Sequence, residues 1–196
     1  MKRYIRRLPV VLVLVSSLAA CDDPIGPVDS IPMTLTINSM NSSDIDPPGR
    51  IEKDENISTE TGNPWGEFIR QAETVCGADP VGFQVLNASI ALDVAGSSDV
   101  QVLEDVISGT ATVFFASTQG SDADAVRVDV ASGSLISGVG PVSLPVIATR
   151  GQLDTLHERL LGGDFHVGLQ AETDRVDADS FSMDVRVTVQ SSAICE

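Results

Sequence analysis

Apolar and polar residues alternate one by one along several stretches of the chain, as in β-strands that bury one face. These stretches are 31–38, 83–94, 126–130, 142–148, 165–172 and 181–190. A further stretch, 110–118, is apolar on both faces, as in a central strand. The apolar residues move from odd to even positions near Val85 and Leu86, which indicates a β-bulge. Pro145 predicts an edge position for its strand, because proline lacks the N–H that a neighbouring strand needs.

Two stretches show helical spacing instead. Asn63 and Pro64 suit the cap and first turn of a helix that Gly77 ends. The apolar stripe of this helix consists of Trp65, Phe68, Ile69, Ala72 and Val75. The second helix spans 150–161 and has three leucines on one face, followed by two glycines. A short helical turn is also expected within 98–109.

About seven strands, each with one apolar face, need a second layer that covers them. We therefore expect a mainly β fold, an antiparallel β-sandwich with the two helices at its periphery. The alternative is an α+β fold in which both helices cover one sheet. The polar turn between 165–172 and 181–190 predicts that these strands pair with each other. Residues 40–63 are polar and show neither period, so we expect a long loop there, within a single domain over 31–196.

The first 20 residues differ from the rest of the chain. Residues 1–7 hold four basic side chains, and 8–18 form an apolar run that is shorter than the roughly 20 residues needed to cross a bilayer. This order is typical of an export signal. The end of the run, Leu18-Ala19-Ala20-Cys21, resembles the lipobox of bacterial lipoproteins. The resemblance implies that residues 1–20 are removed as a signal peptide and that Cys21 is acylated.

Acylation of Cys21 would attach the protein to a membrane through its acyl chains. Residues 21–30, acidic and with two prolines, would then act as a flexible tether. The resemblance thus implies a membrane-anchored protein of the bacterial cell envelope, with its domain in the periplasm or at the cell surface. It leaves the choice between inner and outer membrane open. An ordinary cleaved signal, with Cys21 as an incidental thiol, is the alternative.

The chain is strongly acidic, with a formal net charge of −16. Four of its 12 basic residues lie in the first 20, so the remainder sets eight basic residues against 28 acidic ones. Such a surface repels nucleic acid and anionic headgroups, and we expect no nucleic-acid partner. A solvated acidic coat explains the charge most simply, and a site for cations or a basic partner is the alternative. Aromatic residues make up only 4% of the chain, which predicts an aliphatic core without a stacking platform.

Two cysteines remain besides Cys21. In an exported chain, Cys76 and Cys195 meet an oxidising compartment, which favours a disulfide between them. A catalytic thiol is the weaker interpretation, because neither cysteine has a Cys-x-x-Cys partner or an adjacent basic residue.

Acidic residues supply the candidates for a metal site. Residues 44–55 resemble an EF-hand calcium loop, with Asp44, Asp46 and Glu55 at its first, third and twelfth positions. However, Pro47 and Pro48 oppose the required turn, and no amphipathic helix precedes the loop. A second set, Asp174, Asp177 and Asp179, lies in one polar turn, where aspartate is also an ordinary turn former. We therefore expect no cofactor, with calcium as the alternative.

Catalytic motifs are missing from the sequence. His157 and Glu158 begin like a zinc-protease motif, but Leu161 stands where the second histidine should be. His166 falls on the polar face of its strand, so we expect both histidines at the surface. The sequence has no nucleophile elbow, phosphate-binding loop or dinucleotide fingerprint.

These features favour a lipid-anchored cell-envelope protein that acts as a non-catalytic interaction or structural module, with an envelope protein as a possible partner. One alternative is a calcium-dependent binding module that uses the acidic sets above. Another is a hydrolase whose residues meet only in three dimensions.

Overall fold

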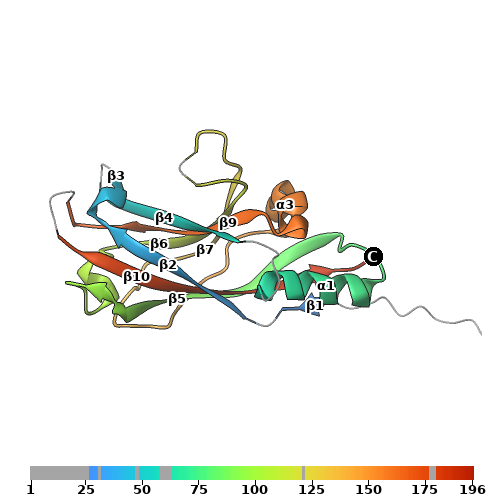
Figure 1. The fold of residues 1–196 in the computed structure, drawn as a ribbon, viewed down its shortest axis with the longest axis horizontal. Coiled ribbons are helices and arrows are strands. Elements are labelled where there is room, and N and C mark those ends of the chain that lie inside the picture. Colours follow the sequence, from blue (N-terminus) through green and yellow to red (C-terminus); the bar gives the residue numbers. More distant parts are fainter. Residues whose placement is uncertain (1–26, 31, 47–48, 58–62, 121, 177–179) are drawn as a thin grey trace, which may run out of the picture.

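Two antiparallel sheets face each other in the computed structural model, which describes residues 27–196 except 31, 47–48, 58–62, 121 and 177–179 (Figure 1). Sheet A has the order β1 (Val28–Asp29), β10 (Ser182–Ile194), β5 (Gly82–Ser98) and β8 (Val142–Leu144), and β2 (Met33–Asn41) also pairs with β10. Sheet B has the order β3 (Ile45–Asp46), β4 (Arg50–Ile57), β9 (Phe165–Glu172), β6 (Ala111–Ala116) and β7 (Arg127–Gly133). The predicted β-sandwich is confirmed.

The alternating residues of the strands form the core between the sheets. Ile90, Leu92, Val185 and Val187 of sheet A and Val167 and Leu169 of sheet B are almost fully buried. The core is largely aliphatic, as the composition predicted, and most of its aromatic rings form one cluster of Trp65, Phe68, Phe83, Phe115 and Phe165. The bulge is also confirmed, because the pairing of β5 with β10 skips Leu86. Strand β8 lies at the edge of sheet A, as Pro145 predicted, and pairs there only with β5. It is shorter than the predicted strand 142–148, because Pro145 and Ile147 form hydrogen bonds with β7 of sheet B instead.

Helix α1 (Pro64–Cys76) begins and ends as predicted. The Asn63 side chain accepts a hydrogen bond from the Trp65 backbone N–H at 2.8 Å, and Gly77 ends the helix with a φ of 71°. The first four residues of the predicted stripe are buried, whereas Val75 is 44% exposed. The stripe is therefore one residue shorter than predicted.

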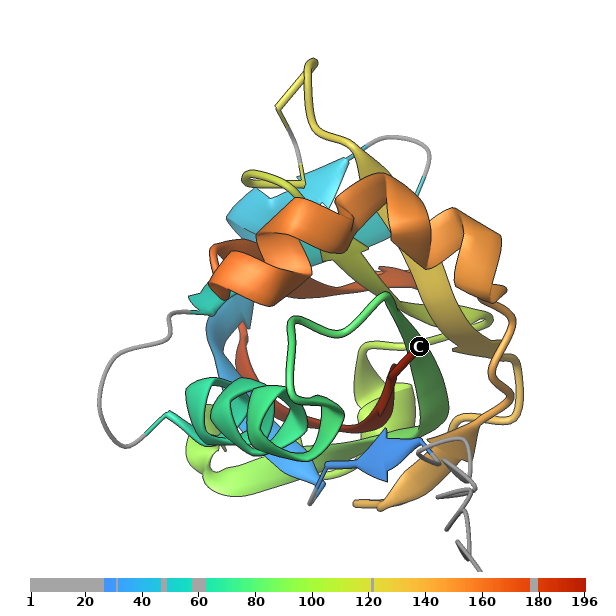
Figure 2. The ribbon, with the colours of Figure 1, turned by 90° about the vertical axis from the view of Figure 1, so that its right-hand side faces the viewer.

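The helical segments lie together at one end of the sandwich (Figure 2). The second segment is a succession of α2 (Arg150–Leu153), η3 (Asp154–Leu156) and α3 (His157–Gly162). The Trp65 indole N–H donates to the Leu160 carbonyl at 2.8 Å, which joins α1 to α3. The Trp65 ring also meets the Phe165 ring edge-on, with centroids 4.9 Å apart. The helices thus close one end of the sandwich. The α+β alternative required both helices to cover one sheet, and they do not.

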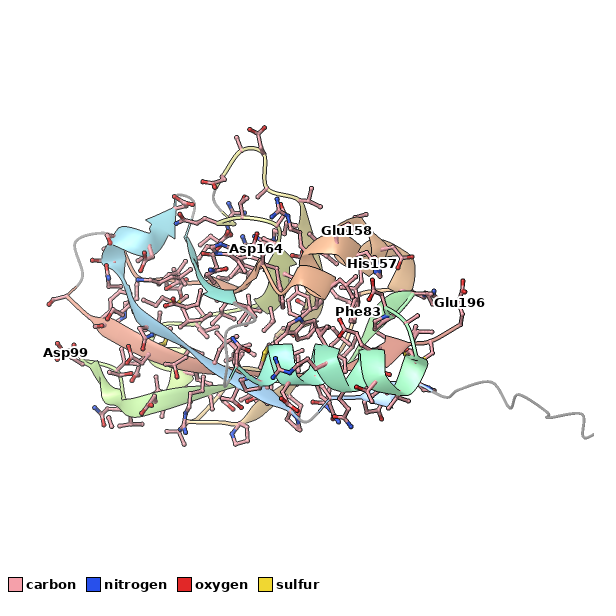
Figure 3. All side chains as sticks on the ribbon, turned by 45° about the vertical axis from the view of Figure 1, so that its right-hand side comes forward. Phe83, Asp99, His157, Glu158, Asp164 and Glu196 are labelled. Atoms are coloured by element: carbon pink, nitrogen blue, oxygen red, sulfur yellow. A yellow bond between two sulfur atoms is a disulfide. The ribbon has the colours of Figure 1, made fainter. Side chains whose placement is uncertain are left out.

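The predicted disulfide between Cys76 and Cys195 is present. It joins the end of α1 to the residue that follows β10. Strand β10 lies inside sheet A rather than at its edge. Glu196 lies at this end of the molecule, and Asp99 lies at the opposite end (Figure 3).

Three expectations about the strands are wrong. Strand β9 pairs with β4 and β6 in sheet B, while β10 lies in sheet A, so the turn between them connects the two sheets instead of forming a hairpin. The stretch expected as a loop over 40–63 contains the 3₁₀ helix η1 (Ser42–Asp44), β3 and the eight-residue β4. Residues 28–30, expected in the tether, join sheet A through β1.

The hydrophobic pattern did not predict strand β4, because two charged residues occupy positions on the side of the strand that faces the other sheet. Ile51 and Ile57 are buried between the sheets, but Lys53 and Glu55 share their side of the strand. Both side chains reach the edge of β2 and bind its backbone. The alternation that marks a half-buried strand is therefore broken at its centre.

A 3₁₀ turn, η2 (Leu103–Asp105), closes the short apolar segment after β5, where the sequence predicted a helical turn. The Asp105 carboxylate accepts hydrogen bonds from the backbone N–H groups of Gln101 and Val102 at 2.7 and 3.1 Å. These bonds favour the charged form and lower the pKa of Asp105, and Arg175 adds a smaller effect in the same direction. No helix in the described part of the chain is long and apolar enough to span a membrane.

The disulfide closes a loop with a sequence separation of 119 residues, which predicts a large effect on the unfolded chain. Replacing Cys76 and Cys195 together by Ala should lower the free energy of unfolding by up to about 4–5 kcal/mol, because the chain-entropy term grows with loop length. Urea unfolding of the full-length protein and the variant would measure the difference. A loss smaller than about 1 kcal/mol would contradict the expected contribution of this bridge.

Candidate functional site

A polar cleft lies on the outer face of sheet B. Two protrusions rise from this face, one formed by η1 with β3 and the other by the loop 117–126 (Figure 1). The cleft has a volume of about 530 Å³, and its floor is made by β4, β9 and β7. The residues that line it are polar, charged or glycine. We call it the sheet B cleft.

Glu52 is the centre of the cleft floor. Its Oε2 atom accepts a hydrogen bond from Gln170 Nε2 and pairs with Arg127 Nη1 at 2.9 Å. Arg127 also donates through Nε to Asp129 at 2.9 Å. The Glu52 side chain is only 15% exposed, so its carboxylate is held rigidly by three strands. Among the described residues, its second oxygen has no hydrogen-bond partner.

Asp54 lies on the same face of β4, two residues further along. Its side chain is 7% exposed. One oxygen lies 3.3 Å from Nδ1 of His166, and the other accepts a hydrogen bond from the backbone N–H of Gly120. This second bond fastens the loop 117–126 to the sheet and fixes one wall of the cleft.

An aromatic ring supports the floor from below. Phe114 is fully buried although it lies on the outer face of sheet B. The Arg127 guanidinium covers the ring, with its carbon 3.8 Å from the ring centroid, a cation–π contact. Gly168 and Gly120 leave the space for the ring, because a Cβ atom at either position would overlap it. The ring therefore holds Arg127 in place above it.

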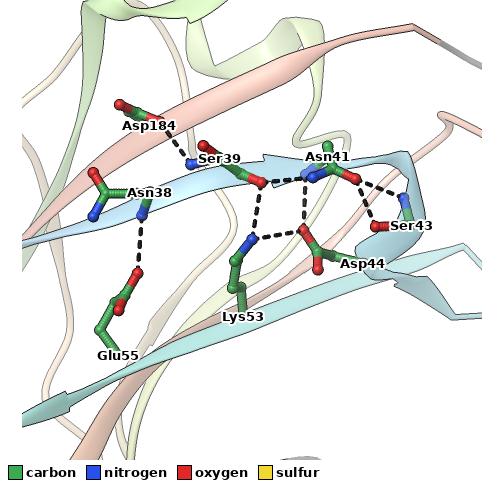
Figure 4. A network of polar contacts seen from close by, with 8 residues as sticks. All are labelled: Asn38, Ser39, Asn41, Ser43, Asp44, Lys53, Glu55 and Asp184. Atoms are coloured by element: carbon green, nitrogen blue, oxygen red, sulfur yellow. Dashed lines mark hydrogen bonds and ion pairs between the residues drawn. The ribbon is translucent and has the colours of Figure 1, made fainter.

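The wall at η1 is tied to β2 and β4 by a second polar network (Figure 4). Lys53 Nζ donates to the Ser39 carbonyl at 2.9 Å and pairs with Asp44 at 3.3 Å. Asp44 also accepts from the backbone N–H of Asn41 at 2.9 Å. On the same edge, Glu55 accepts from the backbone N–H of Asn38 at 3.3 Å. These contacts hold the two sheets together beside the cleft.

The structure separates the candidate calcium ligands. Asp44 is bound to Lys53, and Glu55 lies in a strand and binds β2, so residues 44–55 do not form an EF-hand loop. Asp46 pairs across the β3–β4 hairpin with Arg50. Asp174 is exposed, while Asp177 and Asp179 lie outside the described residues, as does the lipobox with Cys21. Within the part of the chain that is described, no three His, Cys, Asp or Glu residues are grouped for a metal ion.

The histidines are less exposed than expected. His166 is bound to Asp54 and its side chain is 23% exposed. His157 lies beside Phe83, with ring centroids 5.7 Å apart (Figure 3). Asp54 orients His166 as a carboxylate orients a catalytic base, but no described hydroxyl or thiol forms a hydrogen bond with the ring. Among the described residues, no hydroxyl or thiol is therefore bonded to His166 for activation as a nucleophile.

The cleft residues give no signal in sequence order. Glu52 and Gln170 are 118 positions apart, and Glu52 and Arg127 are 75 apart. The one signal for a strand at β4 is that Ile51 and Ile57 lie on the same side of an extended chain. Lys53 and Glu55 share that side and interrupt the apolar pattern. A scan against protein-family models finds no match, and a search of the curated proteins finds none either. The functional argument therefore depends on the geometry of the cleft.

The fit of Phe114 between two glycines can be tested by a double-mutant cycle. Replacing Gly168 by Ala should lower the free energy of unfolding by about 1–3 kcal/mol, because the new methyl group overlaps the Phe114 ring. In a Phe114→Leu background the cost should be smaller, since the ring is gone. Chemical unfolding would measure both. Gly151→Ala is the matched control, because nothing lies within 4 Å of a Cβ there, and strictly additive effects would contradict the fit.

Proposed function

We propose that the protein is a lipid-anchored protein of the bacterial cell envelope and that its domain is a non-catalytic interaction module. Its binding surface is the sheet B cleft. The observation that carries the proposal is the cleft itself, in which charged side chains are fixed by mutual bonds on the outside of a sheet. Such an arrangement adds little stability, since exchanging buried ion pairs for apolar residues is often neutral or favourable. Ligand binding would explain why these charged side chains are fixed there.

The η1 wall of the cleft lies far from the proposed anchor. The described chain enters sheet A at β1, where Val28 pairs with Ala193 near the end of β10. At the other end of β10, Ser182 pairs with Asn41, directly before η1. These positions on β10 are 11 residues apart, or roughly 35 Å at about 3.3 Å per residue. The η1 wall of the cleft is thus remote from the side that would face the membrane.

The connection between Cys21 and β1 is short, which keeps the domain near the proposed anchor. Between Cys21 and β1 lie residues 22–27, whose reach is at most about 20 Å at roughly 3.3 Å per residue. The domain would stand close to the membrane, with the cleft turned away from it. Two or three acyl chains would hold it firmly, whereas the acidic surface is repelled by anionic headgroups. Attachment would depend on Cys21 alone.

The anchor has a direct chemical test. In cells fed an alkyne-bearing fatty acid, the wild-type protein should become labelled and stay with the membranes after an alkaline wash. Cys21→Ser should lose the label, because it lacks the thiol that is acylated. Asp23→Ser keeps the thiol and serves as the control. A labelled Cys21→Ser protein would refute acylation at this residue.

The binding surface can be tested in intact cells by photo-crosslinking. A photoreactive phenylalanine derivative at Gln119, which is exposed on the loop wall, should capture an envelope component because it faces the cleft. The same group at Ser143, exposed on β8 of sheet A, is the matched control. Adducts would be detected by a change in mobility and identified by mass. Equal capture at both positions, or capture at neither, would count against the cleft as the binding surface.

A further inference from the structure

We infer that the sheet B cleft takes a neutral, hydroxyl-rich ligand, namely a short glycan segment. This inference rests on the proposed function, because it assigns a ligand class to the same cleft. It starts from the charge balance of the cleft, which differs from that of the whole chain.

The charges of the cleft largely compensate one another. Lys53 pairs with Asp44, and Arg127 pairs with Glu52. Arg50 stands opposite Asp46 across the β3–β4 hairpin, and His166 lies against Asp54. Four carboxylates and three basic side chains thus line the cleft, which is close to a balance although the chain carries a formal net charge of −16.

Such a balance disfavours charged ligands. An anion is repelled by the surrounding acidic surface and finds Lys53 and Arg127 already paired with carboxylates. A basic peptide would have to displace Arg127 or Lys53, which would leave a poorly solvated charge without a partner. An apolar ligand finds no apolar side chain among the lining residues. A neutral ligand with many hydroxyl groups avoids all three costs.

The free hydrogen-bonding groups suit hydroxyl groups. The second oxygen of Glu52 can accept a bond, and the fixed guanidinium of Arg127 lies beside it. Gln119 and Ser43 are exposed on the two opposite walls, and the Ser43 hydroxyl, which donates to Asn41 at 2.7 Å, can still accept a bond. Neighbouring hydroxyls of a sugar are both donors and acceptors, and planar carboxylate, amide and guanidinium groups can bind two of them at once. The carboxylate of Glu52 and the guanidinium of Arg127 are held in place before the ligand arrives, which lowers the entropic cost of binding.

The size of the cleft agrees with this ligand, since small-molecule sites occupy about 300–1,000 Å³. The ring of Phe114 does not line the cleft, because Arg127 covers it. Binding therefore depends on hydrogen bonds without stacking on an aromatic ring. We expect a correspondingly weak affinity for a single short glycan.

The inference can be tested on the lipidated full-length protein in a detergent without sugar groups. The probes are maltohexaose, cellohexaose and chitohexaose, with hexagalacturonate and hexalysine as charged comparators. Saturation-transfer NMR suits weak binding. At least one neutral oligosaccharide should bind, and neither charged comparator should bind more tightly. Glu52→Gln should weaken this binding about tenfold, the effect of losing one hydrogen bond to a charged group.

Two further variants separate binding from folding. Gln119→Ala changes an exposed wall residue and should weaken binding without altering the melting temperature. Glu67→Gln removes one negative charge from the exposed surface of α1 and should leave binding unchanged. Binding of none of the neutral probes, preference for a charged comparator, or equal binding by all variants would overturn the inference. If Gln119 still captures an envelope component in cells while no neutral probe binds, the glycan assignment fails and the proposed function stands.

Discussion

The two sheets are joined along one edge by charged side chains of β4, and the cleft depends on this junction. A half-buried strand normally places apolar residues towards the opposite sheet, yet Lys53 and Glu55 occupy two of these positions in β4. They bind the backbone of Asn38 and Ser39 in β2. Because successive side chains point to opposite faces, this register turns Glu52 and Asp54 outward onto the cleft floor. The contacts that close the sandwich and the groups that form the site are set by one strand.

The edge of β2 that binds Lys53 and Glu55 contains a β-bulge. Asn38 and Ser39 face the single residue Asp184 where the pairing of β2 with β10 shifts, and Ser39 adopts a positive φ of 53°. The Ser39 N–H donates to the Asp184 carboxylate at 2.7 Å, and Gly96 leaves room for that carboxylate (Figure 4). The bulge turns the Ser39 carbonyl towards Lys53. A β-bulge thus re-aims a backbone group next to the candidate site, as bulges often do.

Much of the fold could be predicted from the sequence because its signals are local. The cap and first turn of α1, the strand alternation, the bulge at Leu86 and the disulfide depend on neighbouring residues or on a simple count of cysteines. The partner of β9 could not be predicted, since two amphipathic strands joined by a polar turn can form a hairpin or lie in different sheets. The cleft could not be predicted either. Its residues come from strands distant in sequence, and Phe114 looks like an ordinary core residue until Gly168 and Arg127 are seen around it.

The position of β10 has a consequence for the order in which the domain can assemble. This strand pairs with β1, β2 and β5, and it follows all of them in the chain. Sheet A therefore lacks its central member until residues 182–194 are available, and Cys76 has no partner until Cys195 follows. If the chain crosses a membrane amino end first, as the proposed export requires, β1 and β2 would stay unpaired during passage, because β10 is the only described strand with which they pair. The late arrival of the central strand would then postpone the completion of sheet A until the whole domain has crossed.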